Sequence, residues 1–225
     1  MSRAARGAAA GAFAALVAVA VVAPSGRPVA ASNPAAIDLV VPRYLVAGGA
    51  PGTVIAQVRD AEGEPVADGI TVTFTASLGV VMRPIAAVTE DGQAVTTATP
   101  ATMSGFAQIT AQAGSARDDQ LLWVRPGPAA SIATLLAEPA VVPFAGSAEI
   151  VLRAVDAFGH AAEGDAVSWS VAGGTLSAAD ALMAGGTARA SAHAAPDAGR
   201  LVVGVAVGSA RGTLVIPVTA DSAPW

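Results

Sequence analysis

Apolar and polar residues alternate along most of this chain, which is the pattern of β-strands that bury one face. Ile70, Val72 and Phe74 alternate with threonines, so this segment has one apolar face and one hydroxyl face. The same period of two recurs at 54–58, 107–112, 167–171 and 201–207. Turn signals containing glycine separate these segments at intervals of roughly 8–12 residues, and helical periodicity is almost missing. The pattern predicts an all-β chain built as β-sandwiches.

The chain contains the same turn twice. An apolar strand runs into Asp60-Ala61-Glu62-Gly63, and about 96 residues later another runs into Asp156-Ala157-Phe158-Gly159. Further along, Gly114-Ser115-Ala116-Arg117 recurs letter for letter at 208–211. Repetition of turn chemistry at domain-sized spacing predicts two copies of one β-module. In both turns we expect the aspartate, Asp60 or Asp156, to accept hydrogen bonds within the turn and the glycine to take a positive φ.

Aligning the two copies pairs Phe74 with Trp169, on the inward face of the strand expected to be central. We expect both aromatic side chains to fill the core of their sandwiches. The alternative, an aromatic platform for a ligand, would require these two side chains to lie on an exposed face.

The first 31 residues have the three parts of a secretory signal peptide. Arg3 and Arg6 precede an apolar run at 8–23, and the small residues Val29-Ala30-Ala31 predict cleavage after Ala31. An uncleaved N-terminal anchor is the alternative, but a membrane span needs about 20 well-apolar residues and this run is shorter. We find no second run of spanning length and expect no membrane span in the mature chain.

The mature chain divides at Pro126-Gly127-Pro128, where two prolines fix the backbone and predict a short, stiff linker. We expect one sandwich at 34–125 and a second at 129–220, joined by the linker 126–128 into an elongated rod. A tail at 221–225 ends in Trp225, which either frays with the tail or docks onto a partner or the module itself.

Composition restricts the classes of partner. Hydrophobic residues make up 53% of the chain and charged residues 13%, so the mature part is expected to fold. The net charge is −5 and the basic residues are scattered, which argues against nucleic acid as a partner. Cysteine is absent, which excludes a thiol nucleophile, a cysteine-based zinc site and a lipid-modified cysteine.

The chain contains two histidines as candidates for a Ser-His-Asp site. His160 lies in the second Asp-x-x-Gly turn, near Asp156 and Glu163, and His193 lies in an alanine-rich stretch. No Gly-x-Ser-x-Gly elbow accompanies them, and a turn histidine between polar neighbours is usually solvated. We expect no catalytic residues.

Acidic pairs were considered as glycosidase or calcium-binding residues. Glu90-Asp91 and Asp118-Asp119 fall in predicted loops, and Asp60 with Glu62 lies in the first turn. Aromatic residues make up 4% of the chain, with Tyr44 as its one tyrosine, which offers little lining for a sugar. None of the acidic sets has the spaced Asp-x-Asp-x-Asp form of a calcium loop. We therefore expect solvated loops, with no metal-binding or cofactor-binding residues.

The repeated motif resembles that of bacterial immunoglobulin-like domains of the invasin/intimin type, group 1. The first copy reads Asp60-Ala61-Glu62-Gly63-Glu64-Pro65-Val66 and continues into the strand that ends at Phe74, and Thr89-Glu90-Asp91-Gly92 matches the later Thr-x-x-Gly element. The second copy keeps its Asp-x-x-Gly but has His160-Ala161-Ala162 in place of x-Pro-Val. The resemblance implies two tandem Ig-like β-sandwiches after the signal peptide, used as stalk or display units. It carries over no receptor-contact residues.

These observations favour an exported, non-enzymatic structural or adhesion-type protein, secreted or at the bacterial cell surface. We expect a monomer that acts as a spacer or display module, with a protein or cell-surface partner of unknown identity. The alternatives are a binder of glycan or protein through a groove near Pro126–Pro128, and an accessory module of a secreted enzyme. The sequence leaves three fates open for the exported chain: it is released, held at the surface by a partner, or tethered by an uncleaved leader.

Overall fold

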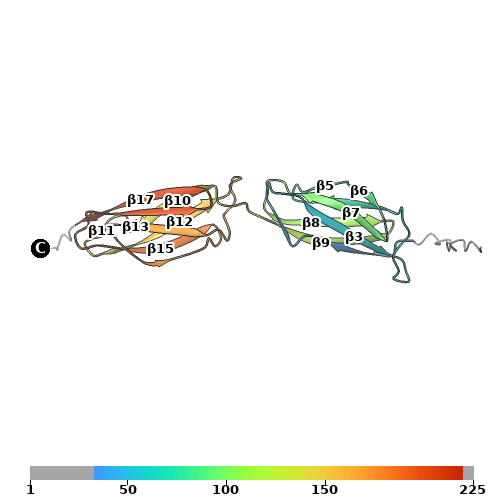
Figure 1. Ribbon diagram of the computed structural model, residues 1–225, viewed down its shortest axis with the longest axis horizontal. Coiled ribbons are helices and arrows are strands. Elements are labelled where there is room, and N and C mark those ends of the chain that lie inside the picture. Colours follow the sequence, from blue (N-terminus) through green and yellow to red (C-terminus); the bar gives the residue numbers. More distant parts are fainter. Residues whose placement is uncertain (1–32, 220–225) are drawn as a thin grey trace, which may run out of the picture. The chain divides into compact units, whose positions relative to one another are not determined.

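A computed structural model describes residues 33–219, so the expected signal peptide at 1–31 and the tail with Trp225 lie outside the described residues. All regular elements within 33–219 are β-strands. This part of the chain forms no helix long and apolar enough to cross a membrane. The strands build two β-sandwiches, drawn in blue to green and in yellow to red in Figure 1. The expected all-β fold is confirmed.

The first sandwich consists of a four-stranded and a five-stranded sheet. In order across the four-stranded sheet, its strands are β1 (Ala36–Val40), β3 (Gly52–Arg59), β7 (Gln93–Thr99) and β5 (Val81–Arg83). In order across the five-stranded sheet, they are β2 (Tyr44–Val46), β9 (Ala116–Arg125), β8 (Gly105–Ala113), β4 (Thr71–Ala76) and β6 (Ala86–Val88). All neighbours are antiparallel except β2 and β9, which are parallel.

The second sandwich repeats this topology with two four-stranded sheets. One sheet has the order β10 (Ser131–Glu138), β12 (Ser147–Val155), β15 (Thr187–Ala194) and β14 (Gly174–Ala179). The other has the order β11 (Val142–Pro143), β17 (Ala210–Thr219), β16 (Arg200–Val207) and β13 (Val167–Ala172). The parallel pair recurs as β11 with β17, and a single bridge between Ala166 and Leu182 stands where the first sandwich has β6.

The letter-for-letter repeat forms the same hairpin in both sandwiches. Gly114 joins β8 to β9 with φ 57°, and Gly208 joins β16 to β17 with φ 52°. A two-residue loop with glycine at its first position is favoured because this backbone twist matches the twist of the flanking strands. The repeat therefore encodes a hairpin turn.

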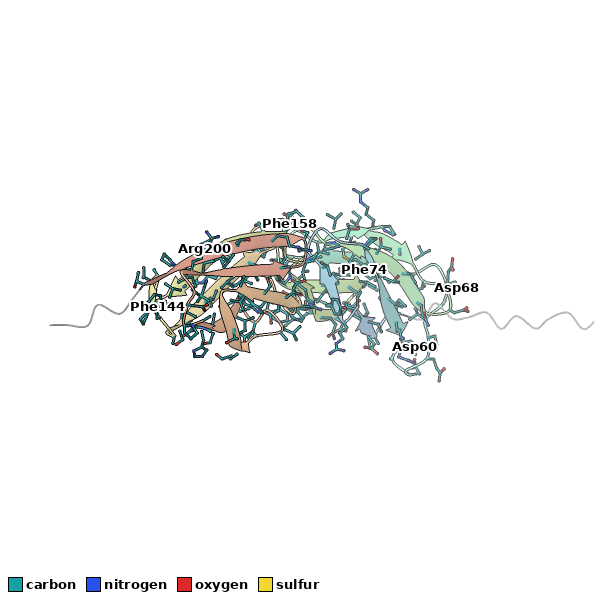
Figure 2. All side chains as sticks on the ribbon, turned by 60° about the vertical axis from the view of Figure 1, so that its left-hand side comes forward. Asp60, Asp68, Phe74, Phe144, Phe158 and Arg200 are labelled. Carbon is teal, nitrogen blue, oxygen red and sulfur yellow. The ribbon has the colours of Figure 1, made fainter. Side chains whose placement is uncertain are left out.

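The alternating segments place their apolar residues in the cores, as the sequence predicts. Phe74 is 1% exposed and lies among fully buried residues of β3 and β8, such as Val54 and Ile109. Figure 2 shows Phe74 within the first sandwich, between the strands. Each exposed threonine of β4 alternates with a buried residue of the same strand. The period of two therefore places the apolar residues on the buried face of the strand and the threonines on its exposed face.

Trp169 is less enclosed than the alignment predicts. It is partly buried on β13 and packs against both groups of core residues in the second sandwich. Its indole Nε1 donates a hydrogen bond to the Asp180 carbonyl oxygen at 2.8 Å. An indole ring is larger than a phenyl ring and its N–H needs an acceptor, so its polar edge reaches the margin of the core.

The two parts of the family-like motif meet at one end of the first sandwich. The Thr89 side chain is fully buried, and its hydroxyl donates to the Ala67 carbonyl at 2.7 Å and accepts from the Ile70 amide at 3.0 Å. A Cβ on Gly92 would lie 2.6 Å from the Pro65 Cβ, so this position has no room for a side chain. The Thr-x-x-Gly element therefore anchors the chain that follows the Asp-x-x-Gly turn.

Candidate functional site

The first Asp-x-x-Gly turn is held by its aspartate. Asp60 Oδ1 accepts hydrogen bonds from the backbone N–H groups of Glu62 at 3.1 Å and Glu64 at 2.9 Å. Gly63 takes φ 83°, a conformation that glycine adopts without steric cost. Figure 2 shows Asp60 and Asp68 on loops beyond the strand ends. The turn role expected for Asp60 is confirmed.

The second turn uses the same chemistry and adds two contacts. Asp156 Oδ1 accepts from the amides of Phe158 at 2.8 Å and His160 at 2.9 Å. Its Oδ2 accepts from the Gly127 amide of the predicted linker at 2.8 Å and lies 3.0 Å from His160 Nδ1. Asp156 is 2% exposed. This turn therefore also fixes the chain that leads into the second sandwich.

The environment of Asp156 changes its acidity. Burial raises the pKa of Asp156, but three backbone N–H groups and the His160 ring donate to or contact the carboxylate and lower it. The lowering contributions prevail, so the pKa lies below the ordinary value for an aspartate. The carboxylate is therefore kept charged and committed to structure.

The arrangement required for a Ser-His-Asp site is not formed by the described residues. His160 contacts the Asp156 carboxylate, but no hydrogen bond joins either histidine ring to a serine hydroxyl in residues 33–219. His193 lies on an exposed position of β15. The His160 contact belongs to the turn.

One prediction about the acidic pairs is wrong. Glu90-Asp91 lies in the turn between β6 and β7, as expected, but Asp118 and Asp119 lie within β9 and not in a loop. Asp118 Oδ2 accepts from the Leu39 amide at 2.9 Å, and Asp119 pairs with Arg117 at 2.9 Å. Asp118 faces inward and accepts from a neighbouring strand, whereas Asp119 lies on the exposed side and is held by Arg117 and the Thr110 hydroxyl, so both carboxylates have partners within the strand environment. Within residues 33–219 no three acidic or histidine side chains gather closely enough to hold a metal ion.

An exposed group of aromatic side chains lies on the outer surface of the five-stranded sheet. We call it the aromatic face and define it as Tyr44 of β2, Phe106 of β8, and Leu121, Trp123 and Arg125 of β9. Phe106 is 67% exposed, Tyr44 43% and Trp123 39%. Trp123 is paired in register with Phe106 on one side and Tyr44 on the other. The three rings therefore form one row across adjacent strands.

Arg125 is placed among these rings. Its guanidinium carbon lies 4.9 Å from the centre of the Tyr44 ring and 5.4 Å from that of Trp123, which are cation–π distances. The Phe106 and Trp123 ring centres are 6.4 Å apart, with ring planes at 24°. Arg125 belongs to none of the ion pairs among the described residues, and its buried Nε has no hydrogen-bond partner there. Among the described residues, the positive charge of Arg125 is therefore stabilised by its contacts with the Tyr44 and Trp123 rings.

The aromatic face is not predicted by the sequence alone. The outward direction of Phe106 is predictable, because Phe106 and Gln108 alternate with Ala107 and Ile109, which are buried. The neighbourhood of Tyr44 and Trp123 is not predictable in this way, since parallel pairing of β2 and β9 brings together residues far apart in the chain. A low content of aromatic residues therefore does not predict whether those residues lie together on one surface.

The second sandwich has no aromatic residue at the positions that match Phe106 and Trp123. Arg200 pairs with Pro217 just before the buried pair of Leu201 and Ile216, as Phe106 pairs with Trp123 in the first copy. Val215 takes the position of Leu121. The aromatic face is therefore a property of one copy.

Comparison with known proteins identifies the fold. No family model and no curated protein matches the sequence. Among solved structures, the Escherichia coli adhesin FdeC is similar, with a TM-score of 0.61 and 21% identity over 82% of this chain and 64% of that chain. InvD of Yersinia pseudotuberculosis has a TM-score of 0.54 and 19% identity over 84% of this chain and 59% of that chain. This chain therefore matches about three fifths of the length of each structure. The fold expected from the motif, that of bacterial Ig-like domains of the invasin/intimin type, is confirmed.

Proposed function

We propose that this chain is an exported, non-enzymatic, adhesion-type protein that acts at the cell surface or after secretion. In this proposal the first sandwich presents the aromatic face to a partner, and the second sandwich acts as a spacer. FdeC, which shares the fold, is described as an adhesin, and this supports the adhesion role.

The observation that carries the proposal is the aromatic face. Tryptophan, tyrosine and arginine are the side chains most often found where binding energy concentrates at interfaces. The chain has nine aromatic residues in total, and three of them lie side by side on one exposed face. Exposed apolar groups of this kind oppose solubility unless a partner covers them. The matching positions in the second sandwich carry arginine, proline and valine, which offer no aromatic contact.

The adhesion role is tested by labelling the full exported chain and measuring its attachment to a panel of bacterial and eukaryotic cells by flow cytometry. We expect saturable attachment that Trp123→Ala and Phe106→Ala abolish. Phe144→Ala is the matched control, because Phe144 is an exposed aromatic residue of the second sandwich. Attachment to no surface, or attachment that all three variants retain, would contradict the proposal.

Export is tested separately. An antibody against the second sandwich should detect the chain in the medium or on intact producing cells. N-terminal sequencing of that material should begin at Ser32, after the predicted cleavage site. Material found only inside the cells would overturn this part of the proposal.

A further inference from the structure

We infer that the aromatic face binds a glycan, through stacking of sugar rings on its aromatic rings and hydrogen bonds to its polar margin. The inference rests on the proposed function and specifies the class of partner for the same surface.

The spacing of the rings fits a chain of sugars. Tyr44, Trp123 and Phe106 occupy three adjacent strands, and neighbouring strands lie about 4.8 Å apart, so the row extends over about 10 Å. The two neighbouring rings of β8 and β9 are close to parallel. The faces of aromatic rings carry partial negative charge and attract the partly positive C–H groups of a sugar ring. A row of this length suits a short oligosaccharide.

Arg125 favours the same class of ligand. Its Nε is already buried without an acceptor, and no acidic side chain pairs with its guanidinium among residues 33–219. Covering the rings with apolar groups would strip the remaining water from this cation and leave it with aromatic contacts alone, which is costly. An occupant that covers the rings must therefore bring oxygen acceptors to the Arg125 guanidinium, which lies over the Tyr44 and Trp123 rings. The hydroxyl or carboxylate oxygens of a sugar provide them.

The polar margin of the aromatic face favours this class of ligand as well. Gln108 and Thr110 follow Phe106 on the outward side of β8, and Asp119 precedes Leu121 on the outward side of β9. Asp119 is fixed by Arg117 and by the Thr110 hydroxyl. Amide and hydroxyl groups both donate to and accept from sugar hydroxyls, and a carboxylate accepts from them.

These three features together point to a ligand that is apolar on its ring faces and rich in oxygen at its edges. Sugars have this distribution. A proline-rich peptide also stacks on aromatic residues, and it is treated below as an outcome that would overturn the inference.

The test uses the full exported chain on an array of neutral and uronic-acid-containing oligosaccharides, followed by calorimetry with a soluble oligosaccharide that binds. Trp123→Ala and Phe106→Ala should each weaken binding by at least about tenfold, the loss expected for one stacking contact. Arg125→Gln should weaken it while leaving the melting temperature close to that of the parent chain. Phe144→Ala should bind like the parent chain.

A second measurement separates the glycan inference from the adhesion role. Cells that the chain attaches to are treated with sodium periodate, which cleaves sugar diols, and attachment is measured again. Loss of attachment supports the inference, even where the array contains no suitable glycan. Attachment that depends on Trp123 but survives periodate, or capture of proline-rich peptides at this face, overturns the glycan inference and leaves the adhesion role in place. Absence of attachment before treatment contradicts the adhesion role.

Discussion

The two sandwiches share one topology and two repeated turns, but they bury the aspartate of the Asp-x-x-Gly turn to different degrees. Asp60 is partly exposed and holds its turn through Oδ1, whereas Asp156 is 2% exposed and uses both oxygens. The difference comes from the Gly127 amide, which the chain ahead of the second sandwich places against Asp156. The comparison shows that a repeated motif fixes local turn geometry, while its contribution to stability depends on what packs over it.

The matching positions 118 and 212 also differ in the residue they carry and in what it contacts. Asp118 of β9 reaches across to the Leu39 amide, whereas the matching position of β17 is Gly212, where a Cβ would lie 2.7 Å from the Ile132 Cδ1. In one copy a carboxylate satisfies a donor of the first strand, and in the other a core side chain occupies the space. The copies are therefore not interchangeable residue by residue.

The largest effect in this comparison is expected from the central aromatic residues. Phe74→Ala should destabilise the first sandwich by about 4 kcal/mol, because it leaves a cavity in a fully enclosed core. Trp169→Phe should cost the second sandwich only about 1 kcal/mol, because it keeps the ring and loses mainly the hydrogen bond to Asp180. Urea unfolding followed by NMR signals from each sandwich measures both. A loss for Trp169→Phe as large as that for Phe74→Ala would show that the indole contributes more than its one hydrogen bond.

The next effect compares the two turns. Asp156→Ala should destabilise the second sandwich by about 3 kcal/mol, because buried backbone donors, including the Gly127 N–H, lose their acceptor. Asp60→Ala should cost the first sandwich about 1 kcal/mol, because water can replace the exposed carboxylate. Amide hydrogen exchange in each sandwich provides the measurement. A larger loss for the Asp60 variant would contradict the role assigned to Gly127.

Placing an aspartate at position 212, where the first sandwich has Asp118, tests whether the two positions are equivalent. Gly212→Asp should cost about 2 kcal/mol, since the new side chain overlaps Ile132 in a packed region. Gly212→Asp combined with Ile132→Ala should recover part of this loss by making room. Thermal unfolding of both variants decides the point, and a neutral single variant would show that β10 can shift to admit the carboxylate.

The smallest effect is a dependence on pH. Because the pKa of Asp156 is lowered in the folded state, its ionised form stabilises the fold. This contribution is complete above the unfolded-state pKa of about 3.9 and is lost as pH falls through the lower folded-state value. Urea midpoints of the second sandwich between neutral and strongly acidic pH should therefore drop at the acidic end. Asp156→Asn should flatten this drop, and an unchanged drop in that variant would assign it to other carboxylates.

Much of the fold was predictable because it depends on short-range rules. Alternation at 70–75 and 107–112 identified strands and their buried faces, and the Asp-x-x-Gly and Gly114-Ser115 turns set their connections. The pair Asp118-Asp119 is predicted in a loop but lies in strand β9. Their acceptor roles depend on Leu39 and Arg117, one of them far away in the chain. Pairwise contacts of this kind leave no local pattern.

The sequence by itself determined the all-β class, the two copies, the turn chemistry and the parity that points Phe106 outward. Only the tertiary structure decided which outward residues become neighbours. Parallel pairing of β2 with β9 brings Tyr44 beside Trp123, and Arg125 then lies over both rings. The physical reason is that strand parity is set by the local backbone, whereas a surface on a sheet is assembled across strands from distant parts of the chain.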